Sequence, residues 1–218
     1  MTGEIYKIKV SWMLGVLVLL LLIAGPMVAG VASQESYKPK IPLGLDEEAF
    51  KVPQNNPMTK EKIKLGRLLF FDKRLSANNT IACASCHIPA LAFTDGQPVS
   101  TGINNQQGGR SAPTAINRGF STAHFWDGRA ATLEDQSIGP FANLIEHGYT
   151  SHDELIKKIN SIKGYKKLFS DVYGVNKLTK ENVGRAIASF QRTLVSGNSP
   201  FDRFDYEGDQ GAISESAK

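Results

Sequence analysis

Three residues near the middle of the chain have the types and spacing needed to hold a cofactor or a metal. Cys83 and Cys86 are the only cysteines among the 218 residues, they lie three positions apart, and His87 follows directly. This pattern is typical of covalent c-type haem, because the two thiols can form thioethers with the haem vinyl groups and the adjacent histidine can bind the iron. It favours a haem c site with His87 as an axial ligand.

Two other interpretations of the cysteine pair fit the sequence less well. A thioredoxin-like dithiol usually follows a strand and begins a helix, and no strand pattern precedes Cys83. A zinc site needs four ligands, and the other histidines, at positions 124, 147 and 152, lack the usual spacing of a histidine pair.

The sixth position of the iron separates electron transfer from chemistry. All four methionines, at positions 1, 13, 27 and 58, precede Cys83, so the downstream methionine ligand of many small cytochromes is missing. A histidine at position 124, 147 or 152 would give a bis-histidine haem. The other option is an open iron site, which would bind small oxidants.

The N-terminus predicts export. Lys7 and Lys9 precede an apolar stretch over residues 12–24, and small residues follow at Gly30 and Ala32, as in a signal peptide. Residues 12–32 are also just long enough for an uncleaved membrane anchor, although Gly25-Pro26 interrupts the run. Either way we expect the remainder outside the cytoplasm, in the periplasm, where c-type haem is attached.

Composition and periodicity indicate one helical domain. The net charge of +4 is too mild to suggest a nucleic-acid partner, and 41% hydrophobic residues allow a packed core. The pattern predicts helices over residues 59–71, 132–137, 165–173 and 179–194, with a further helix capped by Ser151 and Glu154. Residues 33–58 read as an extended arm. Residues 93–119, rich in glycine, read as a long loop of the kind that is usually functional.

Four separated segments carry the most specific signal. They are LGRLLFFDKRLSANNTIACASCH (65–87), RSAPTAINRGF (110–120), FWDGRAATLEDQSIGP (125–140) and RAIASFQRTLVSGNSPFDRF (185–204). In this order they resemble the N-terminal haem domain of bacterial dihaem cytochrome c peroxidases, a superfamily that includes MauG-like enzymes. The resemblance implies an all-α, cytochrome c-like domain whose long irregular loops wrap around one haem c.

The resemblance also implies roles for individual residues. It makes this haem the peroxidatic one, with His87 as proximal ligand, and it places the distal glutamine and glutamate of the family at Gln136 and Glu146. A carboxylate beside bound peroxide can move a proton between the two oxygens, and an amide can orient the peroxide. We therefore predict Glu146 and Gln136 as catalytic residues. The tryptophan that lies between two haems in the family is Trp126, which predicts electron transfer.

Three positions depart from the family pattern. Many members have a distal histidine in the loop after the haem motif, whereas none occurs here between His87 and His124, so we expect a five-coordinate or water-bound iron. His147 stands where many relatives have methionine. Because it directly follows Glu146, it is the side chain that would bind the iron if the sixth position were occupied, although we expect it at the surface. Ser111 replaces an asparagine of a family calcium site, so calcium is doubtful.

The N-terminal patterns and the resemblance together predict how the chain is divided. Residues 1–32 are the signal or anchor, 33–58 the arm, 59–208 the haem domain, and 209–218 the start of the second haem domain that the family possesses. Because no second Cys-x-x-Cys-His motif follows, we expect a truncated product or a fragment. The alternative is a single-haem protein that receives its second electron from a separate cytochrome.

The predicted function is reduction of hydrogen peroxide to water, with electrons from a small cytochrome c or copper protein. Two alternatives remain: a single-haem electron-transfer cytochrome, and a MauG-like oxidase that modifies a partner protein through Trp126. The sequence leaves open whether the protein is a monomer or a dimer.

Overall fold

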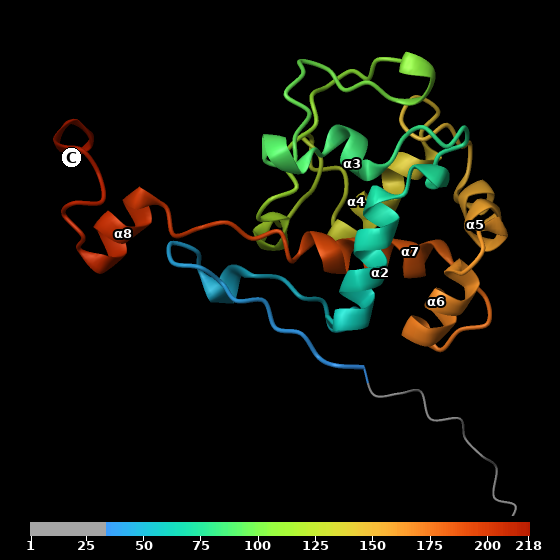
Figure 1. Cartoon of the computed structure of the whole chain (residues 1–218), viewed down its shortest axis with the longest axis horizontal. Helices are drawn as coiled ribbons and strands as arrows, with labels where there is room; N and C mark the ends of the chain where they lie inside the picture. Colours follow the sequence, from blue (N-terminus) through green and yellow to red (C-terminus); the bar gives the residue numbers. More distant parts are fainter. Residues whose placement is uncertain (1–33) are drawn as a thin grey trace, which may run out of the picture. The chain divides into compact units, whose positions relative to one another are not determined.

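The computed structural model describes residues 34–218 (Figure 1). The predicted signal peptide or membrane anchor, residues 1–32, lies outside the described residues. Among the helices of residues 34–218, none combines the length and the apolar character needed to cross a membrane.

Helices and irregular loops make up the described residues, which contain isolated β-bridges but no strand. This confirms the all-α prediction. The α-helices are α2 (Lys60–Phe71), α3 (Cys83–Cys86), α4 (Leu133–Ile138), α5 (His152–Ser161), α6 (Tyr165–Tyr173), α7 (Lys180–Gln191) and α8 (Pro200–Glu207). Short 3-10 helices are η1 (Glu47–Ala49), η2 (Lys73–Leu75), η3 (Pro89–Leu91), η4 (Ile103–Asn105), η5 (Arg118–Phe120), η6 (Gly139–Ala142) and η7 (Glu215–Ala217).

Most predicted helices occur at the expected places. The Thr59 hydroxyl accepts a hydrogen bond from the Lys62 amide at 3.2 Å and begins α2. The helix predicted over residues 179–194 ends instead at Gln191. Its last turn tightens because Thr193 donates through its amide and hydroxyl to the Phe190 carbonyl, at 2.9 and 2.7 Å.

The expected capping box at the start of α5 does not form. Ser151 is the N-cap residue, but its side chain accepts no hydrogen bond from the helix. The Glu154 carboxylate instead accepts from the Thr150 hydroxyl at 2.6 Å and from the Thr150 amide at 3.2 Å. Thr150 therefore competes successfully for the carboxylate that the box requires.

Helix α8 was not predicted, although its sequence carries the ordinary signals. The Ser199 hydroxyl accepts from the Asp202 amide at 3.1 Å, Pro200 stands at the first helical position, and Gly208 ends the helix with φ +72°.

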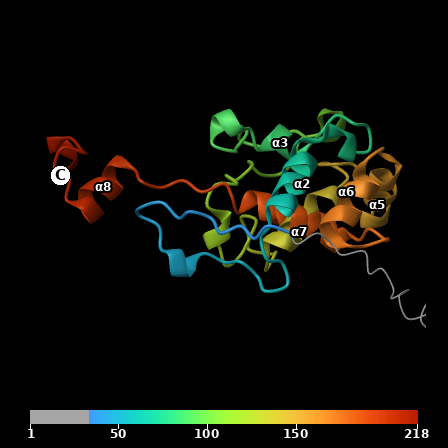
Figure 2. The same ribbon diagram turned by 60° about the horizontal axis from the view of Figure 1, so that its bottom comes forward.

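The core forms where α2 lies across α7 (Figures 1 and 2). Helix α7 also packs against α4, and α2 contacts α3 and α6. Fully buried core side chains come from several of these elements and include Leu65, Leu69, Phe70, Leu155, Ile159, Phe169, Val183 and Ile187. The crossing is close because a glycine, Gly66, faces α7.

We expect Gly66→Ala to destabilise the protein by about 1–3 kcal/mol. A Cβ added at Gly66 would lie 1.8 Å from the carbonyl oxygen of Ala186 and 3.0 Å from Cβ of Phe190, so the two helices would have to separate. Urea unfolding of the haem-loaded protein measures the effect. Gly109→Ala is the matched control, because an added Cβ there meets no atom within 4 Å. Equal stability of the two variants would show that α2 and α7 can accommodate a methyl group at Gly66 without loss of stability.

The long loop is mostly irregular, as predicted, and it is anchored to a distant turn. The Ile103 amide donates to the Ile145 carbonyl at 2.8 Å, and a Cβ on Gly102 would lie 1.9 Å from the same oxygen. Only glycine allows this approach. The loop is thereby held against the turn that carries Glu146.

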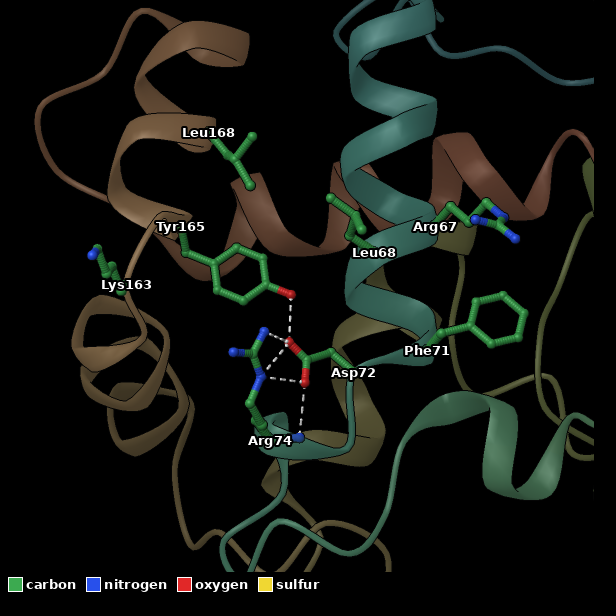
Figure 3. Close-up of a pocket in the computed structure, with 8 residues that line it drawn as sticks. All are labelled: Arg67, Leu68, Phe71, Asp72, Arg74, Lys163, Tyr165 and Leu168. Carbon is green, nitrogen blue, oxygen red and sulfur yellow. Dashed lines mark hydrogen bonds and ion pairs between the residues drawn. The ribbon is translucent and has the colours of Figure 1, made fainter.

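A polar cluster joins the end of α2 to α6 (Figure 3). The Asp72 carboxylate accepts hydrogen bonds from the Tyr165 hydroxyl at 2.8 Å and from the Arg74 guanidinium at 2.7 Å. Partial burial opposes ionisation, yet these hydrogen bonds lower the pKa of Asp72. The hollow beside this cluster shares no lining residue with the cavity that contains the cysteines.

Candidate haem site

The one-turn helix α3 presents both cysteines and the histidine to the same side. The His87 amide donates to the Cys83 carbonyl at 2.9 Å, and the Ser85 hydroxyl accepts from the Ala82 amide at 3.0 Å. Residues three and four apart on a helix are neighbours. Cys83, Cys86 and His87 consequently line one cavity.

The His87 ring is oriented by a backbone partner. Its Nδ1 lies 2.9 Å from the Phe93 carbonyl oxygen, which leaves Nε2 for iron. Burial lowers the pKa of His87, against the opposing effect of the Phe93 and Pro113 carbonyls. The ring is thus held as the neutral imidazole, the form that binds metals.

The two thiols are unlike those of a redox dithiol. Burial raises the pKa of Cys83 to about 12 and that of Cys86 to about 11. Reactive Cys-x-x-Cys motifs have lowered thiol pKa values, because the thiolate is the nucleophile. The site therefore fits thioether attachment better than disulfide exchange.

The cavity has two adjoining parts that share Cys86, His87, Gln136, Pro140 and Glu146. The wider part has a volume of about 400 Å³, within the usual range of cofactor sites. The deeper part has an apolar wall that includes Phe70 and Ile187. A haem anchored at Cys83 and Cys86 would occupy this cavity and contact its apolar wall. The residues present therefore fit the cofactor that the motif predicts.

Glu146 lies in this cavity on a tight turn. The Asn143 side-chain amide donates to the Glu146 carboxylate at 2.7 Å, and the Asn143 side-chain oxygen accepts from the Ile145 amide at 2.9 Å. Burial raises the pKa of Glu146, while the charge of Arg129 and the Asn143 hydrogen bond oppose the rise. A carboxylate with such a pKa is suited to proton transfer.

Gln136 reaches the same cavity from α4. Its side-chain oxygen lies 3.4 Å from the Gln191 side-chain nitrogen of α7, which also donates to the Ser137 hydroxyl at 2.8 Å. The structure thus brings the predicted pair, Gln136 and Glu146, to one cavity with His87, from segments that are separate in the sequence.

Trp126 lines the open side of the cavity and is 62% exposed. Its indole nitrogen donates to the Ser111 carbonyl at 2.9 Å. The neighbouring Asp127 pairs with Arg110 and Arg129, each at 2.9 Å, and these partners, Arg129 foremost, lower the pKa of Asp127 to about 2. The Phe-Trp-Asp-Gly-Arg motif therefore forms a charged rim around an exposed ring.

The prediction that His147 is a surface residue is wrong. Its side chain lines the deep part of the cavity and the residue is only 3% exposed. One contact is long-range, since the His147 carbonyl accepts from the Ala77 amide at 2.9 Å. The other is nearby in sequence, since the ring packs on Phe141 with centroids 4.4 Å apart. Burial lowers the pKa of His147 to about 4, against a small opposing effect of the Pro140 carbonyl.

Sequence reasoning missed two residues that support Glu146. Asn143, three positions earlier, could have been found as an Asx-turn residue, since asparagine side chains commonly bond to nearby backbone amides. Arg129 lies in the recognised Phe-Trp-Asp-Gly-Arg motif, but only the fold places its charge near Glu146.

Comparisons with known proteins identify the family. The family model described as di-haem cytochrome c peroxidase matches residues 60–211. The methylamine utilization protein MauG of Methylophilus methylotrophus is 39% identical over 206 residues, which cover 92% of this chain and 59% of that protein. The cytochrome c peroxidase Ccp of Escherichia coli (strain K12) is 40% identical over 173 residues, 79% of this chain and 37% of that protein.

A solved structure gives the same result. The crystal structure of a MauG-like protein associated with microbial copper homeostasis superimposes with a TM-score of 0.72 and 31% identity, covering 83% of this chain and 52% of that one. The chain spans 59% or less of the length of these three relatives. With its helical fold, its Cys-x-x-Cys-His site and these matches, the chain belongs to the di-haem cytochrome c peroxidase family.

Proposed function

We propose that residues 59–208 form a haem c peroxidase domain that reduces hydrogen peroxide to water in the periplasm. The observation that carries this proposal is the convergence of Glu146 and Gln136 on the cavity lined by Cys83, Cys86 and His87. In this proposal residues 209–218 begin a second haem domain, as the family resemblance implies.

The reaction consumes one peroxide, two protons and two electrons and gives two waters. Haem, when bound through Cys83 and Cys86, supplies the redox centre for breaking the O–O bond. Glu146 takes the proton from one peroxide oxygen and returns it to the other, so that the departing oxygen leaves as water. The raised pKa of Glu146 favours this return, because the carboxyl holds a proton more readily than an exposed glutamate does.

Gln136 and Asn143 have supporting roles. The Gln136 amide orients the peroxide and stabilises the charge that develops on it. Asn143 fixes the Glu146 carboxylate through the 2.7 Å hydrogen bond, so that the group does not have to be ordered during the reaction. Arg129 contributes positive charge on the same side.

The electrons come, in this proposal, from a small cytochrome c or copper protein. The names of several relatives, such as cytochrome c551 peroxidase of Nitrosomonas europaea, support a cytochrome donor. The N-terminal sequence and the extracytoplasmic attachment of haem c support a periplasmic location.

A second candidate is oxidation of a partner protein. It is favoured by the 62% exposure of Trp126 at the open side of the cavity and by the similarity to MauG proteins. An exposed indole beside the haem could pass oxidising equivalents to a partner that never enters the cavity.

We expect the haem-loaded chain to consume hydrogen peroxide while oxidising a reduced small cytochrome c, two cytochromes for each peroxide. Stopped-flow absorbance of the cytochrome, with peroxide measured in parallel, gives the stoichiometry. The control is Cys83→Ala/Cys86→Ala, which should carry no covalent haem on a denaturing gel and should show no turnover.

The same experiment separates the alternatives. Electron exchange with the cytochrome but no reaction with peroxide would indicate a simple electron carrier. Peroxide consumption without cytochrome oxidation, accompanied by oxidation of a protein partner that is lost in Trp126→Phe, would indicate the oxidase.

A further inference from the structure

We infer that His147 is the second axial ligand of the haem iron in the resting protein. The iron is then six-coordinate, with His87 on one face and His147 on the other, and peroxide reacts only when His147 leaves the iron. The inference rests on the proposed haem site, and the assignment of His147 as a ligand is independent of whether the protein reduces peroxide.

The first observation is that both ring nitrogens of His147 are buried without a hydrogen-bond partner. The Pro140 carbonyl is near the ring, but it does not meet hydrogen-bond geometry. Buried polar groups in proteins are nearly always paired, and one that is not requires an explanation. An imidazole that lacks a protein partner in a cofactor cavity is available to the cofactor.

The second observation is that neither of the other two candidate histidines lines the cavity. His87 bonds to the Phe93 carbonyl through Nδ1, and the Nε2 of His152 lies 3.0 Å from the Ile138 carbonyl oxygen. His124 is buried with Nδ1 unpaired. Neither His124 nor His152 lines the cavity, whereas His147 does. Of the three histidines that the sequence allowed as a sixth ligand, the fold selects one.

The third observation is that the backbone of this turn is held in place. The His147 amide donates to the Asn143 carbonyl at 3.1 Å, and its carbonyl accepts from the Ala77 amide at 2.9 Å. The ring lies against Phe141, with centroids 4.4 Å apart. Because the backbone is held and Asn143 holds Glu146, any movement of His147 toward or away from the iron is confined to its side-chain torsions.

The long loop explains why this position is free to take the role. The loop has no histidine between His87 and His124, and it packs on the same turn, through the 2.8 Å hydrogen bond from Ile103 to Ile145. His147 is thus the imidazole that this part of the cavity offers. The inference replaces the open iron site that the sequence suggested.

The test is the ferric spectrum of the haem-loaded chain. We expect the wild-type protein to be low-spin, and pulsed EPR to show hyperfine coupling to two imidazole nitrogens. In His147→Leu, which cannot bind iron, we expect loss of the low-spin signal and a high-spin or water-bound haem. Cyanide should then bind about 10–100-fold more tightly to the variant. In the wild type, only the fraction of molecules in which His147 has left the iron can bind cyanide, and this lowers the apparent affinity.

Matched variants make the result specific. His124→Gln and His152→Gln should keep the wild-type spectrum. His147→Met should lose the hyperfine coupling to the second imidazole. This variant replaces His147→Leu in the experiment if the leucine variant folds poorly. A high-spin wild-type protein, or a low-spin signal that survives in both His147 variants, overturns the inference. If the ligand assignment holds but no variant reacts with peroxide, only the proposed function fails.

Discussion

Glu146→Gln is expected to slow the reaction with hydrogen peroxide by about 10²-fold or more, the usual loss when a general acid–base group is removed. Glutamine preserves the size of the side chain, and it can still meet Asn143, which donates to the carboxylate at 2.7 Å in the wild type. What it removes is the ability to carry a proton. The rate constant should be measured by stopped-flow in the wild-type chain and in His147→Leu, where the inferred ligand is absent.

The pH dependence provides a second signature of this carboxyl. The unprotonated form must accept the first proton, so the rate should fall as pH is lowered through the pKa of Glu146. Because burial raises that pKa, the fall should occur above the ordinary value of 4.5. In Glu146→Gln this limb of the profile should disappear.

Glu154→Gln is the matched control. Glu154 is an exposed glutamate eight positions further along, bonded to Thr150 and away from the cavity lining. Its rate should match that of the wild type. A Glu146→Gln variant as fast as this control would remove Glu146 from the mechanism while leaving the haem site in place.

Arg192→Ala is expected to lower the free energy of unfolding by about 3–5 kcal/mol, the usual cost of breaking a buried ion pair. Arg192 is 3% exposed, and its guanidinium meets the Glu134 carboxylate at two points, 2.7 and 3.0 Å. Without Arg192 the carboxylate stays partly buried and loses its cation. Such a loss is a large part of the free energy of unfolding of a typical domain, which is roughly 5–15 kcal/mol.

The reason for so large an effect is that this pair joins distant segments. The Arg192 Nε donates to the Lys51 carbonyl at 2.8 Å, and the Asn56 amide donates to Glu134 at 2.7 Å. The Lys62 ammonium donates to Asn56 at 3.2 Å. The network therefore connects the N-terminal arm, α2, α4 and the end of α7, and its loss should free the arm as well as weaken the core.

The network also predicts acid sensitivity. Burial opposes ionisation of Glu134, but Arg192 and Asn56 outweigh it and lower the pKa of Glu134. A carboxyl whose pKa is lower in the folded state contributes stability above its unfolded pKa, and that contribution is lost as pH falls through the folded value. The stability difference between wild type and Arg192→Ala should therefore shrink below about pH 4.5.

Urea unfolding measures both effects, with Arg110→Ala as the control. Arg110 forms an exposed ion pair with Asp127, and such pairs contribute about 0–1 kcal/mol. The apolar double variant Arg192→Met/Glu134→Leu should recover part of the loss, because it leaves no unpaired charge. If Arg192→Ala behaves like Arg110→Ala, the network does not hold the arm.

Several features of this protein follow from short stretches of sequence. The haem attachment site could be predicted because Cys83, Cys86 and His87 lie within one helical turn, where spacing alone places them together. Helices α2 and α6 could be predicted from apolar periodicity and, for α2, the Thr59 cap, since these are also local signals. The family resemblance predicted that Gln136 and Glu146 belong to the same site. Their spacing in the sequence alone did not show that they lie close together.

The remaining features depend on contacts between residues far apart in the chain. His147 was expected at the surface because no local pattern in the sequence assigned it to the core. The fold places it in a cavity that distant residues such as Cys83 and Ile187 also line, and its unpaired ring nitrogens are a property of that folded cavity. The role of Arg192 likewise depends on Lys51 and Glu134, which lie far from it in the sequence.

The haem c motif and the helical character of this chain can be read from its sequence, because residues within a few positions of each other encode both properties. Which histidine shares the cavity with His87, how Glu146 is held, and what connects the arm to the core depend on the fold. Burial and partner choice are set by the packing of distant segments, and that packing is a property of the whole chain.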